Sequence, residues 1–220
     1  MVFAMAISAV TAVAQSEDPA NWCRGGLFAS EAPEFKLGTV KGSKNEKVHF
    51  YDDSEADCPP SETCRDKAFV VPGDKLVVSR IYKGFVCSWY IPTKGLPTVG
   101  WIKLGNVDIV DAPAAPPLSA WRGDWAYADD RITFTDNKLK GNLNVTGEAY
   151  WKGLGDNVHE GGLDGRAEPI GRILKLNEAD PDKHACKVTM QLIGNFLVVK
   201  DNINCGGANV SFSGVYRKKK

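Results

Sequence analysis

The residues best suited to acid–base chemistry lie in a glycine-rich stretch in the second half of the chain. His159 and Glu160 are adjacent there, directly before Gly161-Gly162, and Asp164 follows. Histidine titrates near neutral pH, and two carboxyl groups about 5–10 Å apart can cleave a glycosidic bond. A cleft that brought these three side chains together would therefore point to a hydrolase.

The rest of the sequence does not favour catalysis. None of the three histidines, His49, His159 and His184, lies near a G-x-S-x-G nucleophile motif. The neighbouring acids in Asp52-Asp53 and Asp129-Asp130 would face opposite sides of a strand, so neither is a good catalytic pair. The glycine pairs lack the lysine and following helix of a phosphate-binding loop. We therefore predict a protein that is not an enzyme and needs no cofactor or metal.

The six cysteines indicate disulfide bonds, because no C-x-x-C or zinc-like Cys/His spacing occurs. Cys186 and Cys205 are alone in the second half, and a Gly194-Asn195 turn between them can bring the chain back, so they should pair. Cys58 and Cys64 can close a short local loop, which leaves Cys23 for Cys87. Two other pairings of these four remain open: Cys23–Cys58 with Cys64–Cys87, and Cys23–Cys64 with Cys58–Cys87.

The N-terminus has the pattern of a secretory signal peptide. Residues 2–14 are apolar or small and uncharged, and Ala12-Val13-Ala14 is a small-residue cleavage site before a polar stretch. No basic residue precedes the apolar run, so the true start codon is open. No second apolar run approaches the 18 residues of a membrane span. Together with the cysteines, this predicts a periplasmic or secreted protein, cleaved after Ala14 and without a membrane span when mature.

The charge balance argues against nucleic acid as a partner. Lys plus Arg and Asp plus Glu number 27 each, which gives a formal net charge of zero. A nucleic-acid-binding domain normally carries a basic excess or a basic face. The only basic run is residues 217–220, which we interpret as a solvated terminus.

Two β modules follow from the distribution of turns and apolar runs. Residues 111–117 (DAPAAPP) predict a stiff linker. We expect a signal peptide at 1–14, an N-terminal arm at 15–45, a small barrel at 46–111, a linker at 112–117 and a β-barrel or sandwich at 118–220. Because the linker offers few apolar residues, each module should fold independently.

The second module should contain about seven antiparallel strands. Its clearest strands are 132–135, 139–151, 173–176, 186–192 and 196–200, and 210–216 alternates as a final strand. Residues 153–171 are glycine-rich and predict a long loop around a short strand. With almost no helical periodicity anywhere, the fold class is all-β.

The first module resembles a bacterial Src-homology-3-like domain. The resemblance covers about residues 46–111 and rests on the order of residues 70–78 (VVPGDKLVV) and 99–102 (VGWI). It implies a small barrel that binds peptides or peptidoglycan stems. The loop 52–66 with Cys58 and Cys64 departs from the general family pattern.

The end of the second module resembles small bacterial periplasmic proteins, some of them lysozyme-inhibitor-like. The matching residues are 197–201 (LVVKD) and 205–216 (CGGANVSFSGVY). This resemblance implies an inhibitor of a wall-cleaving enzyme.

These observations predict an exported binding module of the bacterial envelope. Its partner would be a peptidoglycan fragment or a wall-active protein. Trp89 and Tyr90 are neighbours on a strand, so one of them should be exposed and could form an aromatic groove with Tyr51. Other candidate binding residues are His159, Glu160 and Asp164 in the expected loop. The alternatives are a structural envelope protein and a hydrolase that uses residues 153–171.

Overall fold

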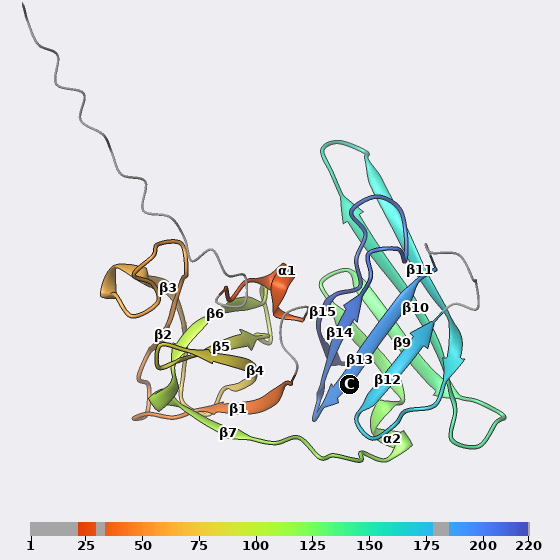
Figure 1. The fold of residues 1–220 in the computed structure, drawn as a ribbon, viewed down its shortest axis with the longest axis horizontal. Coiled ribbons are helices and arrows are strands. Elements are labelled where there is room, and N and C mark those ends of the chain that lie inside the picture. Colours follow the sequence, from red (N-terminus) through yellow and green to blue (C-terminus); the bar gives the residue numbers. More distant parts are fainter. Residues whose placement is uncertain (1–21, 30–33, 178–184, 220) are drawn as a thin grey trace, which may run out of the picture.

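The computed structural model describes residues 22–29, 34–177 and 185–219. It is an all-β protein with two antiparallel sheets side by side, as the sequence predicts (Figure 1). The expected cleavage site after Ala14 and His184 lie outside the described residues. None of the helices in the described ranges is long and apolar enough to cross a membrane.

The first sheet has seven strands in the order β3-β2-β6-β5-β4-β1-β7. Its strands are β1 (Lys36–Val40), β2 (Val48–Tyr51), β3 (Arg65–Val70), β4 (Lys75–Tyr82), β5 (Phe85–Tyr90), β6 (Thr98–Lys103) and β7 (Val107–Val110). Short helical segments are α1 (Gly25–Phe28), η2 (Glu62–Cys64) and η3 (Leu104–Asn106). The strand β1 lies in the segment that we expected to be an arm, and it pairs with both β4 and β7.

The second sheet has eight strands in the order β11-β10-β9-β8-β15-β14-β13-β12. They are β8 (Gly123–Tyr127), β9 (Asp130–Asp136), β10 (Leu143–Lys152), β11 (Val158–Ala167), β12 (Ile173–Asn177), β13 (Lys187–Ile193), β14 (Phe196–Asp201) and β15 (Gly214–Lys218), preceded by the helix α2 (Leu118–Trp121). The two edge strands, β11 and β12, contact each other, so the sheet forms a nearly closed barrel. Trp121, Trp125 and Phe134 are among the side chains that fill its interior.

Three disulfides hold the loops. The pairs are Cys23–Cys87, Cys58–Cys64 and Cys186–Cys205, so the predicted pairing is confirmed and the two alternatives are wrong. Cys23–Cys87 fixes the segment that contains α1 to β5. Cys186–Cys205 joins the residue before β13 to the loop that follows β14.

The two sheets share a buried core, which the sequence analysis did not predict. Alternate residues of β5 point to opposite sides, yet both sides are buried. One side faces the interior of the first sheet, and the other packs against α1 and the second sheet. The shared core is made of Phe28, Phe35, Val77, Cys87 and Trp89 from the first half with Ile193, Phe196, Val198 and Val215 from the second. This shared core does not favour the prediction that each module folds independently.

The last strand begins four residues later than its alternating sequence predicts. Asp201 is 8% exposed and accepts hydrogen bonds from the Ser211 hydroxyl (2.8 Å), the Ser213 hydroxyl (2.7 Å) and the Phe212 N–H (2.8 Å). These bonds hold residues 211–213 around one carboxylate and out of the strand ladder, so β15 starts at Gly214. The tail pattern that carries the lysozyme-inhibitor resemblance thus has a structural role.

Candidate functional site

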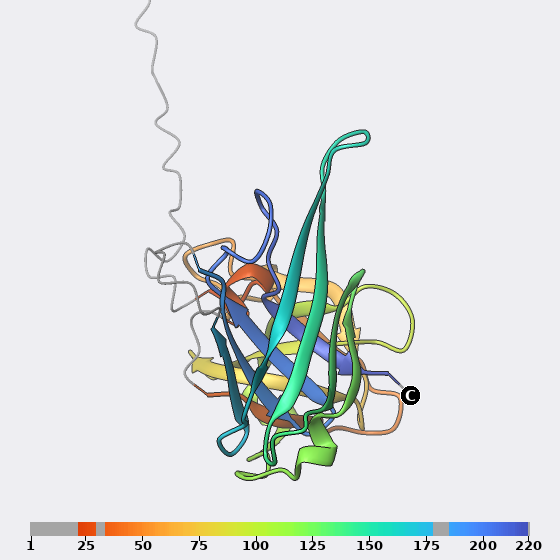
Figure 2. The ribbon, with the colours of Figure 1, turned by 90° about the vertical axis from the view of Figure 1, so that its right-hand side faces the viewer.

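The hairpin β10–β11 rises well beyond the rest of the second barrel (Figures 1 and 2). The two strands pair without interruption from Leu143↔Ala167 to Lys152↔Val158. The neighbouring strand β9 pairs with β10 only as far as Glu148. The end of the hairpin is therefore a two-stranded projection. Residues 158–167, which we expected within a long loop, are one of its strands.

Close packing against a distant loop explains the glycines of β11. Gly161 forms an isolated bridge with Gly206, and a Cβ on Gly161 would lie 2.6 Å from the Cys205 carbonyl oxygen. The Gly162 N–H donates to that oxygen (3.2 Å), and the Gly207 N–H donates to the Glu160 carbonyl (3.0 Å). Gly161 and Gly206 thus allow two backbones to approach closely, and this stretch is a paired strand rather than a loop.

The turn between β8 and β9 supports the other side of the hairpin. Lys152 Nζ lies 2.5 Å from an Asp129 carboxylate oxygen, and the Tyr150 N–H donates to Asp130 Oδ1 (2.9 Å). Burial raises the pKa of Asp130 to about 6, against the opposing hydrogen bond from Tyr150, and the Asp129 charge adds to the increase. Lys152 lowers the pKa of Asp129 through a hydrogen bond and its charge.

The free tip of the hairpin carries an exposed apolar side chain. Leu154 is 97% exposed, and Val158 and Tyr150 behind it are 45% and 37% exposed. The ring of Trp151 packs under the tip, because a Cβ on Gly153 would lie 2.7 Å from it. The sequence analysis missed Leu154. The sequence feature that could have indicated an exposed Leu154 is its place between Gly153 and Gly155, where no core strand is expected to bury it.

The structure does not assemble the predicted trio of His159, Glu160 and Asp164. His159 and Glu160 point to opposite faces of β11, since they are adjacent on a strand. His159 Nδ1 is hydrogen-bonded to the Ala208 carbonyl (2.5 Å), and its ring lies 5.1 Å from that of Trp151. Glu160 and Asp164 share a face but are about 13 Å apart along the strand at 3.3 Å per residue. An acid–base pair at these positions therefore has no geometric support.

The predicted aromatic groove is also not formed as expected. Trp89 is 1% exposed and lies in the shared core, and Tyr51 is 5% exposed. The Tyr51 hydroxyl donates to Glu62 Oε1 (3.2 Å), which also pairs with Lys103 Nζ (2.9 Å). Tyr90 is half-buried. Its pKa is raised mainly by burial, and the charge of the nearby Asp74 raises it further. Both faces of β5 are covered, so the prediction that one of Trp89 and Tyr90 is exposed does not hold.

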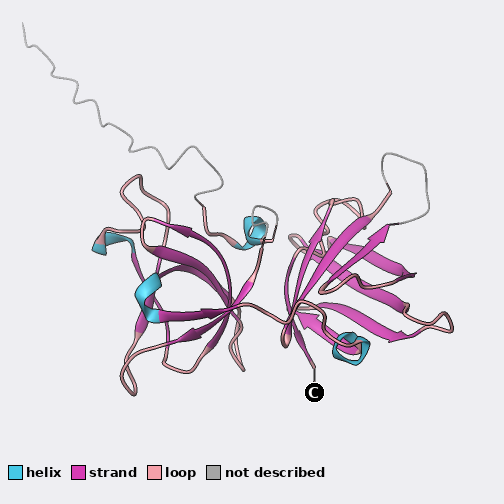
Figure 3. Ribbon diagram, turned by 60° about the horizontal axis from the view of Figure 1, so that its bottom comes forward, coloured by secondary structure: helices cyan, strands magenta, loops and turns pink. Residues whose placement is uncertain are grey.

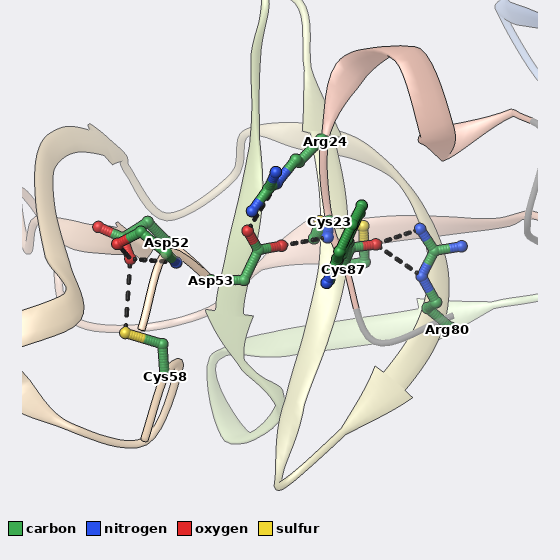
Figure 4. Close-up of polar contacts among 9 residues, drawn as sticks. Cys23, Arg24, Asp52, Asp53, Cys58, Arg80 and Cys87 are labelled. Atoms are coloured by element: carbon green, nitrogen blue, oxygen red, sulfur yellow. Dashed lines mark hydrogen bonds and ion pairs between the residues drawn. A yellow bond between two sulfur atoms is a disulfide. The ribbon is translucent and has the colours of Figure 1, made fainter. Parts of the chain in front are cut away.

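Polar contacts fix the N-terminal segment to the first sheet (Figure 4). Asp53 accepts from the Cys23 N–H (2.5 Å) and from Arg24 Nε (2.8 Å), and Arg80 donates to the Trp22 carbonyl (Figure 4). Asp52 lies near Cys58 and Cys64, but the two sulfurs form a disulfide and are not thiolates. This group is therefore unsuited to a metal ion.

Comparisons of the chain with protein-family models, with curated proteins and with solved structures find no match.

Proposed function

We propose that the protein is a non-enzymatic recognition module of the bacterial envelope, periplasmic or secreted, that inhibits a wall-cleaving enzyme. Inhibition occurs when the tip of the β10–β11 hairpin inserts into the cleft of that enzyme. The observation that carries the proposal is the supported, projecting hairpin with Leu154 97% exposed at its end. The three disulfides agree with an oxidising compartment outside the cytoplasm.

The shape of the hairpin favours binding energetically. Both sides of the hairpin are held, by the loop that contains Gly206 and by the turn that contains Asp129. A recognition element that is already ordered loses little conformational entropy on binding. Burial of a leucine side chain contributes about 1.5–3 kcal/mol. Leu154 is thus suited to serve as the apolar anchor of an interface.

The tip carries a side-chain donor for carboxylates in a cleft. Lys152 and His159, which could have offered donors, already pair with Asp129 and Ala208. The side-chain donor left at the tip is the exposed Asn157 amide, and the exposed acid Asp156 beside it must point away from carboxylates in the cleft. Carboxylates that line a carbohydrate cleft accept such donors. The resemblance of residues 205–216 to lysozyme-inhibitor-like proteins supports the same class of partner.

The test is lysis of bacterial wall suspensions by several lysozyme types, with and without the mature protein. The wild-type chain should protect against at least one type. Leu154→Asp should weaken protection about tenfold or more, because it places a charge where an apolar contact forms. Ile170→Asp is the matched control, since Ile170 is 83% exposed on a different loop. It should protect as the wild type does, and both variants should keep the wild-type melting temperature.

Two results would contradict the proposal. One is absence of protection by the wild-type chain against every lysozyme type. The other is equal protection by Leu154→Asp and the wild type, which would exclude the hairpin tip. If protection is absent, co-sedimentation with purified peptidoglycan would assign a wall component as the partner. A chain that binds neither would be a structural envelope protein.

A further inference from the structure

A cleft of about 630 Å³ lies where the two sheets meet. The first half contributes Lys75, Pro92 and Thr93, and the second half contributes Phe196 and the end of β15. Figure 3 shows the C-terminal end of the chain between the two halves. A ligand in this cleft would contact both halves at once. Its volume is in the range of small-molecule binding sites.

The cleft is basic and contains no carboxylate among its described lining residues. Its cations are Lys75, Arg217, Lys218 and Lys219. Six ion pairs occur elsewhere in the described parts of the chain, and none of them includes these four. Lys75, Arg217 and Lys219 thus bring three positive charges to one hollow of a chain whose formal net charge is zero, while the Lys218 ammonium is turned to Ala120 on the other face of β15. Their mutual repulsion is a cost that a bound anion would remove.

The polar contacts of these side chains are with neutral oxygens. Lys75 Nζ donates to the Thr39 hydroxyl (2.7 Å), and Lys218 Nζ donates to the Ala120 carbonyl (2.8 Å). Arg217 Nη1 donates to the Ile91 carbonyl (3.2 Å). These bonds hold the cations in place, and none of these cations forms an ion pair in the described parts of the chain. Partial burial lowers the pKa of Lys218, as expected for a cation without an anionic partner.

We propose that this basic cleft binds a ligand that carries clustered phosphate groups. A phosphate group offers up to two negative charges and several acceptor oxygens in a small volume. Three cations around one cleft match such a charge density better than the single charge of a carboxylate. Lysine binds phosphate as a point charge, and arginine adds directed N–H donors. Pro92 and Phe196 are the apolar residues among the described lining of the cleft.

The proposal is separate from the hairpin function, because the cleft and the tip use different residues. The first test is calorimetric titration of the full chain with inorganic tripolyphosphate. The double variant Lys75→Glu/Lys219→Glu reverses one exposed charge from each half and should weaken binding about tenfold or more. Lys138→Glu/Lys140→Glu is the matched control, with the same charge change at two exposed positions away from the cleft. It should bind as the wild type does, as should Leu154→Asp.

Binding should also raise the melting temperature of the wild type, because a ligand of the folded state stabilises it. Vesicles containing phosphatidylglycerol identify the source of the phosphate. If the wild-type protein sediments with these vesicles and Lys75→Glu/Lys219→Glu does not, the ligand is a lipid headgroup. If the wild-type protein does not sediment with them, the ligand is a soluble phosphate compound. The proposal is wrong if tripolyphosphate does not bind, if both double variants bind it equally, or if poly-glutamate binds as tightly.

Discussion

The indole ring of Trp89 packs edge-on against the ring of Tyr127, with centroids 5.5 Å apart and planes inclined at 66°. Trp89 belongs to the first sheet and Tyr127 to the second. Tyr127 also contacts Tyr216, which is fully buried in the second barrel (centroids 5.7 Å apart). A continuous series of aromatic contacts thus joins the two halves.

The shared core predicts that both halves unfold together. Trp89→Ala should lower the free energy of unfolding by about 3–5 kcal/mol, because it leaves a cavity between the sheets. Denaturant unfolding followed by circular dichroism and by tryptophan fluorescence should give coincident transitions. Phe69→Ala is the control, since Phe69 is 41% exposed, and it should cost about 1 kcal/mol or less.

Separate halves offer a second measurement of the same prediction. A chain that ends at Asp111 exposes Val77 and Trp89, and a chain that starts at Leu118 exposes Phe196 and Val198. Each should be less stable than the full protein or insoluble. Two independent transitions in the full chain, or two halves as stable as the whole, would contradict a shared core.

The raised pKa of Asp130 predicts a pH dependence of stability. Its folded-state value of about 6 lies above the ordinary value, so the folded chain binds this proton more tightly than the unfolded chain. The free energy of unfolding should therefore fall as the pH rises from about 4 to about 6. Asp130→Asn cannot ionise and keeps an acceptor for Tyr150. At pH 7.5 this variant should be more stable than the wild type by about 1 kcal/mol, after allowance for solvent screening.

Asp129 provides the comparison, because the pKa of its carboxyl is lowered by Lys152. Its contribution to stability is present above the ordinary pKa and is lost as the pH falls, which is the opposite direction. Asp129→Asn should therefore not stabilise the protein at pH 7.5. Thermal unfolding of the three proteins from pH 4 to pH 7.5 measures both effects. A wild-type chain that matches Asp130→Asn at every pH would refute the raised pKa.

The contact between Gly161 and the loop after β14 predicts a steric effect. In Gly161→Ala the new Cβ would lie 2.6 Å from the Cys205 carbonyl oxygen and 2.7 Å from Val210, so the loop must move away. We expect a loss of about 1–3 kcal/mol in the free energy of unfolding. Hydrogen exchange at the Gly162 and Gly207 amides should become faster, because both donate across this contact.

Gly105→Ala is the control for this substitution, because a Cβ there meets nothing within 4 Å. It should leave the stability and the exchange of both amides unchanged. If Gly161→Ala behaves in the same way, close packing is not the reason for glycine in β11.

Much of the local structure follows from the sequence. Alternating apolar residues and turn glycines predict β12, β13 and β14 within one residue of their observed bounds. Cys186 and Cys205 pair as predicted, because each is the only cysteine of the second half available to the other. These features depend on neighbours that are close in the chain, and such neighbours are visible in a single sequence.

The tertiary structure decides the features that depend on distant neighbours. Gly161 and Gly162 favour a loop by their own propensity, but they lie in β11 because the loop around Gly206 packs against them. Val210 and its successors alternate like a strand, yet Asp201 holds residues 211–213 out of the ladder. Trp89 is buried although Val86 on the opposite face of β5 already lies in a core, because the second sheet covers the side of β5 that carries Trp89. Local pattern determines which segments are extended, whereas burial depends on what the rest of the chain places against them.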